Sequence, residues 1–174
     1  MRVTRTPVSS ISDIKIDGNI DMLGYTLSNL GSLVMVKNAG VQLLAALAAD
    51  GDWSGLTVSA TAGAGISKYD TVYFKNDGKV YTTRGDDAAR MPAKGMALVD
   101  IVINEAGLFL VQGFIRRNTW DWTPGQLLYI RDIEAGQITA TPPDTSGDQV
   151  QLVGIAVTAD IAWFRPDTMM LEIT

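Results

Sequence analysis

The chain has no cysteine and no histidine among its 174 residues. Without cysteine it has neither disulfides nor a thiolate nucleophile. Without histidine it lacks the commonest zinc ligand and the side chain used most often as a general base near neutral pH. What remains is chemistry that uses carboxylates alone, as in glycoside hydrolysis or a magnesium site, or no chemistry.

Long apolar runs and clustered positive charge are also missing. No uninterrupted apolar stretch reaches the ~18 residues of a membrane span, and the 14 basic residues are scattered in a chain of net charge −5. Neither a membrane nor nucleic acid is therefore an expected partner. The opening MRVTRTPVSS is not followed by an apolar segment or an Ala-x-Ala cleavage site, so we expect synthesis in a cytoplasm without a secretory signal.

Apolar residues make up 47% of the chain and charged residues 19%, which is too apolar for a disordered protein. The length suffices for one compact domain, alone or with an arm, but not for two large domains.

The carboxylates are placed as turn formers rather than as catalysts. Acid–base catalysis needs two of them roughly 5–9.5 Å apart across a cleft, and no spacing in the sequence selects such a pair. Asp17, Asn19 and Asp21 alternate like the start of a calcium loop, yet no glutamate closes the set. We therefore predict no catalytic residue, no metal site and no cofactor. The aspartates in turn-like stretches are Asp50, Asp52, Asp86, Asp87, Asp144 and Asp148.

From residue 56 onward, short β-type runs alternate with turn residues, at the spacing of an all-β sandwich or barrel. The clearest run is TVYFKNDGKVYTT, residues 71–83, in which Val72 and Phe74 share one face and Thr71 and Tyr73 the other. Asn76-Asp77-Gly78 supplies residues that tolerate positive φ. The stretch predicts a β-hairpin.

The second half of this region repeats the first. LLYIRDIEAGQITAT matches the hairpin, with Tyr129 on Tyr73 and Gly136 on Gly78, and VQLVGIAVT matches MPAKGMALV, with Gly154 on Gly95 and Ala156 on Ala97. The offset drifts from 56 to 59 residues, as loops of slightly different length would require. The pattern predicts a mainly β fold: a C-terminal β-barrel or sandwich of two related halves, residues 56–174.

The first 55 residues follow a different pattern. SDIKIDGNIDMLGYTLSNLGS alternates apolar and polar residues around short turns, which indicates an arm of short strands. In NAGVQLLAALAADGD, Val41, Leu44, Leu47 and Ala48 fall on one face at helical spacing. With Asn38 as N-cap and Gly51 as stop, this predicts one short helix.

Two tryptophans in the stretch NTWDWTPGQ could mark a ligand site. Trp120 and Trp122 would share one face of an extended strand, with Asp121 on the other face, and Pro124-Gly125 then predicts a type II turn. The tryptophans could stack on a sugar, or they could anchor the fold or a subunit contact through the ~150–250 Å² that each aromatic buries. The structural interpretation is favoured.

These residues carry a resemblance. GFIRRNTWDWTPGQLLYI, with the Ser-Gly-Asp-Gln-Val strand entry and the terminal Phe-x-Pro-Asp hairpin, resembles a β-domain of tailed-bacteriophage virion proteins, found in head-fibre, tail-fibre and capsid-decoration contexts. The likeness covers about residues 66–173. DGNIDMLGYTLSNLG separately resembles short segments of phage fibre proteins, where such a strip joins an oligomeric shaft or attachment region.

The resemblance implies a non-enzymatic virion structural protein, made in the host cytoplasm and trimeric. The short arm favours a capsid decoration (cement) protein, which would bind a major capsid protein or another virion protein through residues 1–55. The first alternative is a short tail-fibre or baseplate protein that binds a host-surface glycan, and the second is a carbohydrate-binding or glycan-cleaving module that uses Trp120 and Trp122. The implied attachment and oligomer interface of the arm consists of Ile14, Ile16, Ile20, Met22, Leu23, Tyr25, Leu27 and Leu30.

Overall fold

The structure is a computed structural model that describes residues 40–174. All the predicted interface residues of the arm, from Ile14 to Leu30, lie outside the described residues. The described part forms a compact unit from Val41 to Thr174. Its first strand, β1 (Trp53–Thr61), crosses residue 55, where the sequence places the domain boundary.

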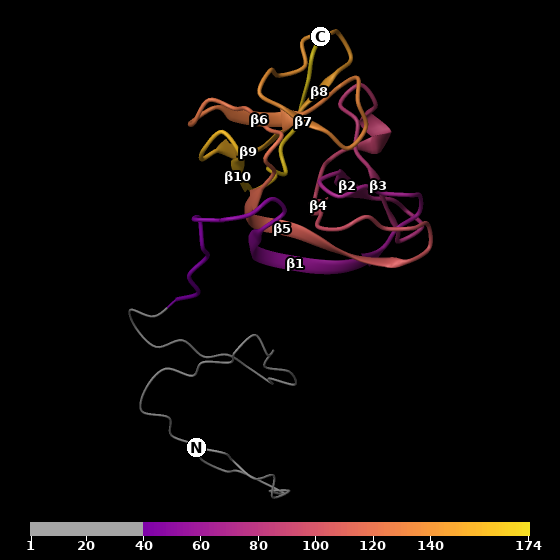
Figure 1. The fold of residues 1–174 in the computed structure, drawn as a ribbon. Coiled ribbons are helices and arrows are strands. Elements are labelled where there is room, and N and C mark those ends of the chain that lie inside the picture. The colour runs from indigo at the N-terminus through magenta and orange to yellow at the C-terminus, as the bar shows by residue number, and fades with distance from the viewer. Residues whose placement is uncertain (1–39) are drawn as a thin grey trace, which may run out of the picture. The chain divides into compact units, whose positions relative to one another are not determined.

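The fold is mainly β, as predicted, and its sheet curls into a half-barrel. Nine strands form one sheet, in which β1 and β5 make a long ribbon with β2, β3 and β4 to one side and β6, β7, β9 and β10 to the other (Figure 1). A separate pair joins β8 to β11. The remaining elements are β2 (Thr71–Phe74), β3 (Val80–Thr82), the 3-10 turn η1 (Ala88–Arg90), β4 (Gly95–Ala97), β5 (Ala106–Arg116), β6 (Leu127–Ile130), β7 (Ile138–Thr139), β8 (Gln149–Val150), β9 (Leu152–Ala156), β10 (Ile161–Phe164) and β11 (Leu171–Glu172).

The predicted short helix, with Val41, Leu44, Leu47 and Ala48 on one face, is wrong, since residues 40–50 contain no helix. Leu47 is buried, but Val41 and Leu44 are more than 60% exposed, so a helical apolar stripe would find nothing to cover it. The backbone N–H groups of Ala48 and Ala49 instead donate to the Asp52 carboxylate. This segment is thereby tied to the start of β1 in an irregular conformation.

The predicted hairpin of residues 71–83 is confirmed. Strands β2 and β3 pair antiparallel, with Val72 opposite Thr82 and Phe74 opposite Val80. Gly78 has a φ of 79° in the connecting turn, a conformation that glycine adopts at little cost.

The predicted duplication is confirmed strand by strand. The first repeat consists of β1, β2, β3, β4 and the N-terminal half of β5, and the second of the C-terminal half of β5, β6, β7, β9 and β10. Strand β5 therefore ends one repeat and begins the other. Five cross-strand pairs of the first repeat have an equivalent pair in the second, given after each: Tyr73↔Tyr81 with Tyr129↔Thr139, Phe74↔Val80 with Ile130↔Ile138, Val72↔Gly95 with Leu128↔Gly154, Ala97↔Phe109 with Ala156↔Ala162, and Met96↔Leu110 with Ile155↔Trp163.

Each repeat has its own buried cluster. The small core, which includes Val72, Val80 and Phe109, fills the first repeat, where Ala62 bridges to Val80 beyond the end of β1. The large core fills the second repeat and also takes in Met96 and Leu110 from the first. The first repeat thus contributes side chains to both clusters, and the second covers one face of the first.

Candidate interaction surface

The two predicted aromatic contact residues lie in and against the large core. Trp120 is 9% exposed and Trp122 is partly buried, and their rings stack with centroids 4.2 Å apart. The edge of the Tyr69 ring meets Trp120 at 5.9 Å. The next residues form the predicted turn, in which Gln126 N–H donates to the Thr123 carbonyl at 3.1 Å and Gly125 has a φ of 88°. With Trp120 covered, the pair acts as framework rather than as an open platform.

Tyr69 is the strained residue beside this pair. Its φ of 74° is uncommon for a bulky side chain, and it is held by a turn in which Asp70 N–H donates to the Ser67 carbonyl. The Arg117 guanidinium lies 4.9 Å from the ring centroid and the Lys68 ammonium 5.0 Å. Burial raises the pKa of the Tyr69 hydroxyl. These contacts of cations and aromatic rings hold Tyr69 of the first repeat against Trp120 and Arg117 of the second.

Asp70 is a buried carboxylate at the same contact between the two repeats. It accepts hydrogen bonds from Ser67 N–H at 2.9 Å and from the Gln137 side-chain amide at 3.1 Å, and Gly136 packs directly against it. Desolvation raises the pKa of the Asp70 carboxyl above its ordinary value of 3.8, although both hydrogen bonds act in the opposite direction. The folded protein therefore holds this proton more tightly than the unfolded chain.

Asp70→Asn should consequently change the pH dependence of stability. Because the pKa of Asp70 is raised in the folded protein, its contribution to the free energy of unfolding is fully present below the unfolded pKa. That contribution is lost as the pH rises through the folded pKa. Asparagine does not titrate. The substitution also removes one hydrogen-bond acceptor, and the effect of that removal on stability does not depend on pH. Urea unfolding measures the free energy of unfolding of both proteins. We expect the value for the variant to rise relative to that of the wild type between about pH 3 and about pH 7. A difference that stays level, or moves the other way, contradicts this assignment.

A row of partly exposed apolar side chains lies on the outside of the second repeat. Leu127 of β6, Ile155 of β9, Trp163 of β10 and Phe114 of β5 stand directly opposite one another in successive strands, and we call these four residues the apolar row. Leu127 is 44% exposed and Trp163 36%. The rings of Phe114 and Trp163 stack at 6.2 Å, the arrangement expected of a cross-strand aromatic pair. The row crosses four strands of the sheet.

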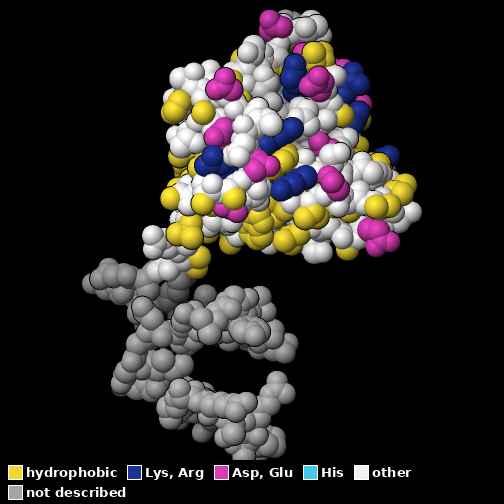
Figure 2. All heavy atoms as spheres, in the orientation of Figure 1, with side chains coloured by type: hydrophobic (Ala, Val, Ile, Leu, Met, Phe, Trp, Pro, Cys, Tyr) yellow, Lys and Arg dark blue, Asp and Glu magenta, His cyan; other side chains and the backbone are white. Residues whose placement is uncertain are grey.

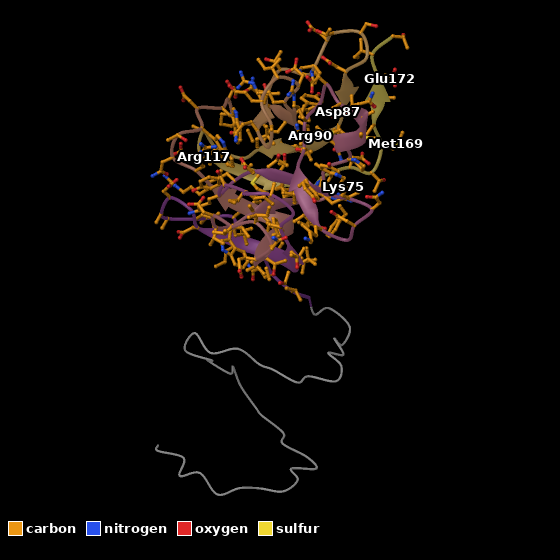
Figure 3. The ribbon with its side chains drawn as sticks, turned by 90° about the vertical axis from the view of Figure 1, so that its right-hand side faces the viewer. Lys75, Asp87, Arg90, Arg117, Met169 and Glu172 are labelled. Carbon is orange, nitrogen blue, oxygen red and sulfur yellow. The ribbon has the colours of Figure 1, made fainter. Side chains whose placement is uncertain are left out.

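A groove of about 380 Å³ lies against this row. It is lined by Leu152, Ile155 and Trp163, and by Arg165 and Asp167 from the segment that follows β10. A second hollow of about 220 Å³ shares Leu152 and Asp167 and is lined by apolar side chains of the β8–β11 region. One of these, Met169, is 71% exposed and lies with Glu172 on the side of the domain away from Arg117 (Figure 3).

We call the apolar row and the two hollows together the outer face of the second repeat. Hydrophobic side chains also gather over β1 and β5, at the lower edge of the view in Figure 2. Leu56 of β1 is two residues from Ser54, which pairs with Phe114, so it extends the outer face by one more exposed side chain. A sheet face with this many exposed apolar side chains suits contact with another protein surface.

The sequence analysis missed Trp163 and Phe114 as surface residues. The repeat contained the signal, because one further matched strand would have aligned Trp163 with Leu110. Sequence alone does not tell which of the two is covered.

Within residues 40–174, no group of three or more acidic side chains is arranged to hold a metal ion. In the same part of the chain, no helix has the length and hydropathy that a bilayer crossing requires. Neither protein-family models nor curated proteins give a match to this chain.

Proposed function

We propose that this chain is a non-enzymatic structural protein of a tailed-bacteriophage particle, a trimeric capsid decoration protein. Its arm, residues 1–55, attaches to the major capsid protein or another virion protein, and its β-domain is displayed outside the shell. Apolar contacts at ~25 cal/mol per Å² of buried surface need not be strong one by one, because a trimer multiplies them through avidity.

The observation that carries the proposal is the position of the motifs that resemble phage virion proteins. Phe164 to Asp167, the Phe-x-Pro-Asp segment, ends β10 and continues along the groove. Gln149 and Val150, of the Ser-Gly-Asp-Gln-Val motif, form β8, and Val150 lines the second hollow. Phe164 is itself buried in the large core, but the residues that follow it and Val150 line the two open hollows of the outer face rather than an enclosed pocket, which supports a role in assembly.

Deletion of Met1–Ser32 tests the proposal. Because the compact unit begins at Val41, the shortened chain should unfold at the same temperature as the full chain but should no longer sediment with empty capsid shells. Full chain and deletion variant are mixed with purified shells, pelleted and quantified. If the shortened chain pellets as well as the full chain, attachment through the arm is wrong.

A further inference from the structure

We propose that the outer face of the second repeat is the surface through which copies of this chain associate. The inference deepens the proposed function, on which it rests for the expectation of an oligomer. It assigns the contact between copies to named residues of the β-domain.

The geometry of the apolar row favours a flat protein partner. With neighbouring strands ~4.8 Å apart, four aligned side chains extend over ~15 Å. A single sugar ring would use one aromatic side chain and several hydrogen-bonding groups, whereas this row offers Leu127, Ile155, Trp163 and Phe114 in line. A sheet face or an apolar edge of another protein matches that shape.

The first repeat shows what covers the equivalent row. There, Thr71, Met96 and Leu110 occupy the positions of Leu127, Ile155 and Trp163, and all three are 0% exposed. Met96 and Leu110 belong to the large core, together with residues of the second repeat such as Ala156 and Ala162. The equivalent surface of the first repeat is therefore covered within the chain by apolar residues of the second repeat.

Charges beside the groove complement one another between copies. Arg165 and Asp167 are exposed, and among residues 40–174 neither forms an ion pair. Their backbones are fixed, since Arg165 N–H donates to the Val153 carbonyl at 2.8 Å and Asp167 N–H to the Leu152 carbonyl at 2.9 Å. In a closed ring of copies such as a trimer, residue i of one copy faces residue j of the next copy. Arg165 can thus face Asp167 of the neighbouring copy.

The absence of native cysteine allows a direct test. Full-length Arg165→Cys and Asp167→Cys proteins are mixed in equal amounts, allowed to exchange and treated with a short bis-maleimide linker. We expect a covalent dimer that joins one variant to the other. Lys75→Cys, on the exposed β2–β3 turn, should give no such product with either variant (Figure 3).

Charged substitutions in the apolar row provide the second measurement. In the cross-linking pair, Trp163→Glu or Leu127→Glu should reduce dimer formation at least about tenfold, as loss of a central anchor does. Trp53→Glu is the matched control, because Trp53 is 39% exposed but pairs with the buried Ile115 and so lies on the other side of the sheet. Thermal unfolding of each variant verifies that it is folded.

Two results would overturn the proposal. One is a mixture of Arg165→Cys and Asp167→Cys that yields no more dimer than the Lys75→Cys mixtures. The other is a cross-link that Trp163→Glu and Leu127→Glu leave unchanged. The proposed function is tested independently, because shell binding depends on the arm. If the protein cross-links as expected but does not bind shells, the association surface stands and the capsid role is wrong.

Discussion

Replacing Trp120 by alanine is expected to lower the free energy of unfolding by about 3–5 kcal/mol, the cost of removing a large buried aromatic side chain. Trp120 is 9% exposed, stacks on Trp122 at 4.2 Å and meets the edge of Tyr69 at 5.9 Å. Its loss would leave a cavity beside Tyr69, whose positive φ depends on surrounding contacts. Guanidinium unfolding, followed by far-ultraviolet circular dichroism, measures the change.

Trp53→Ala is the control for this experiment. Trp53 lies on β1 with 39% of its surface exposed, and we expect its replacement to cost about 1 kcal/mol, because only part of its surface is removed from water. Equal effects at Trp120 and Trp53 would show that Trp120 is not part of the core. A loss well below about 2 kcal/mol at Trp120 would support the open-platform interpretation instead.

Gly154→Ala is expected to be the second severe substitution. A Cβ at this position would collide with the Trp163 carbonyl oxygen and would lie 3.3 Å from Phe164 Cα, both in the backbone of β10. Strands β9 and β10 would have to separate, and we expect a cost of about 3 kcal/mol, the upper part of the usual range for overpacking. The midpoint of chemical denaturation, with an unchanged slope, reports the loss.

Gly95→Ala is the matched control, because Gly95 is the equivalent residue of the first repeat. A Cβ there would meet Phe109 Cβ at 3.2 Å and the Leu110 carbonyl at 3.5 Å, contacts that a shift of a few tenths of an ångström relieves. We expect a change of about 1 kcal/mol or less, since alanine also reduces the entropy of the unfolded chain. Similar costs at both glycines would contradict the difference in strand packing between the repeats.

The β fold and its duplication could be read from the sequence because local signals and pairing agree. Asn76-Asp77-Gly78 sets the turn, alternation sets the faces, and the matches of Tyr129 with Tyr73 and Gly154 with Gly95 reappear as equivalent residue pairs. Gly113 lies against Gly55, where the backbones of β5 and β1 approach closely, and the β1–β5 register shifts between Leu56 and Thr57.

The helix prediction failed for a physical reason. The spacing of Val41, Leu44 and Leu47 is helical, but a short amphipathic helix is stable only when its apolar stripe packs against something. Asp52 instead accepts hydrogen bonds from the backbone of Ala48 and Ala49. The spacing of apolar residues in the sequence predicts an apolar stripe, but it does not show whether another part of the fold packs against that stripe.

The candidate surface was missed for a related reason. Trp120 and Trp122 are conspicuous as a pair, whereas Trp163 stands alone in IAWF. Burial of Leu110 and exposure of Trp163 at equivalent positions depend on which repeat covers the other. That asymmetry arises from tertiary packing, so no local pattern in either repeat contains it.

Electron microscopy of empty capsid shells mixed with the full chain tests the central claim most directly. The account predicts added density on the outside of the shell at regular positions, and none when Met1–Ser32 are deleted. Bare shells with the full chain, or density that appears only on tails when intact particles are imaged, would contradict a capsid decoration role.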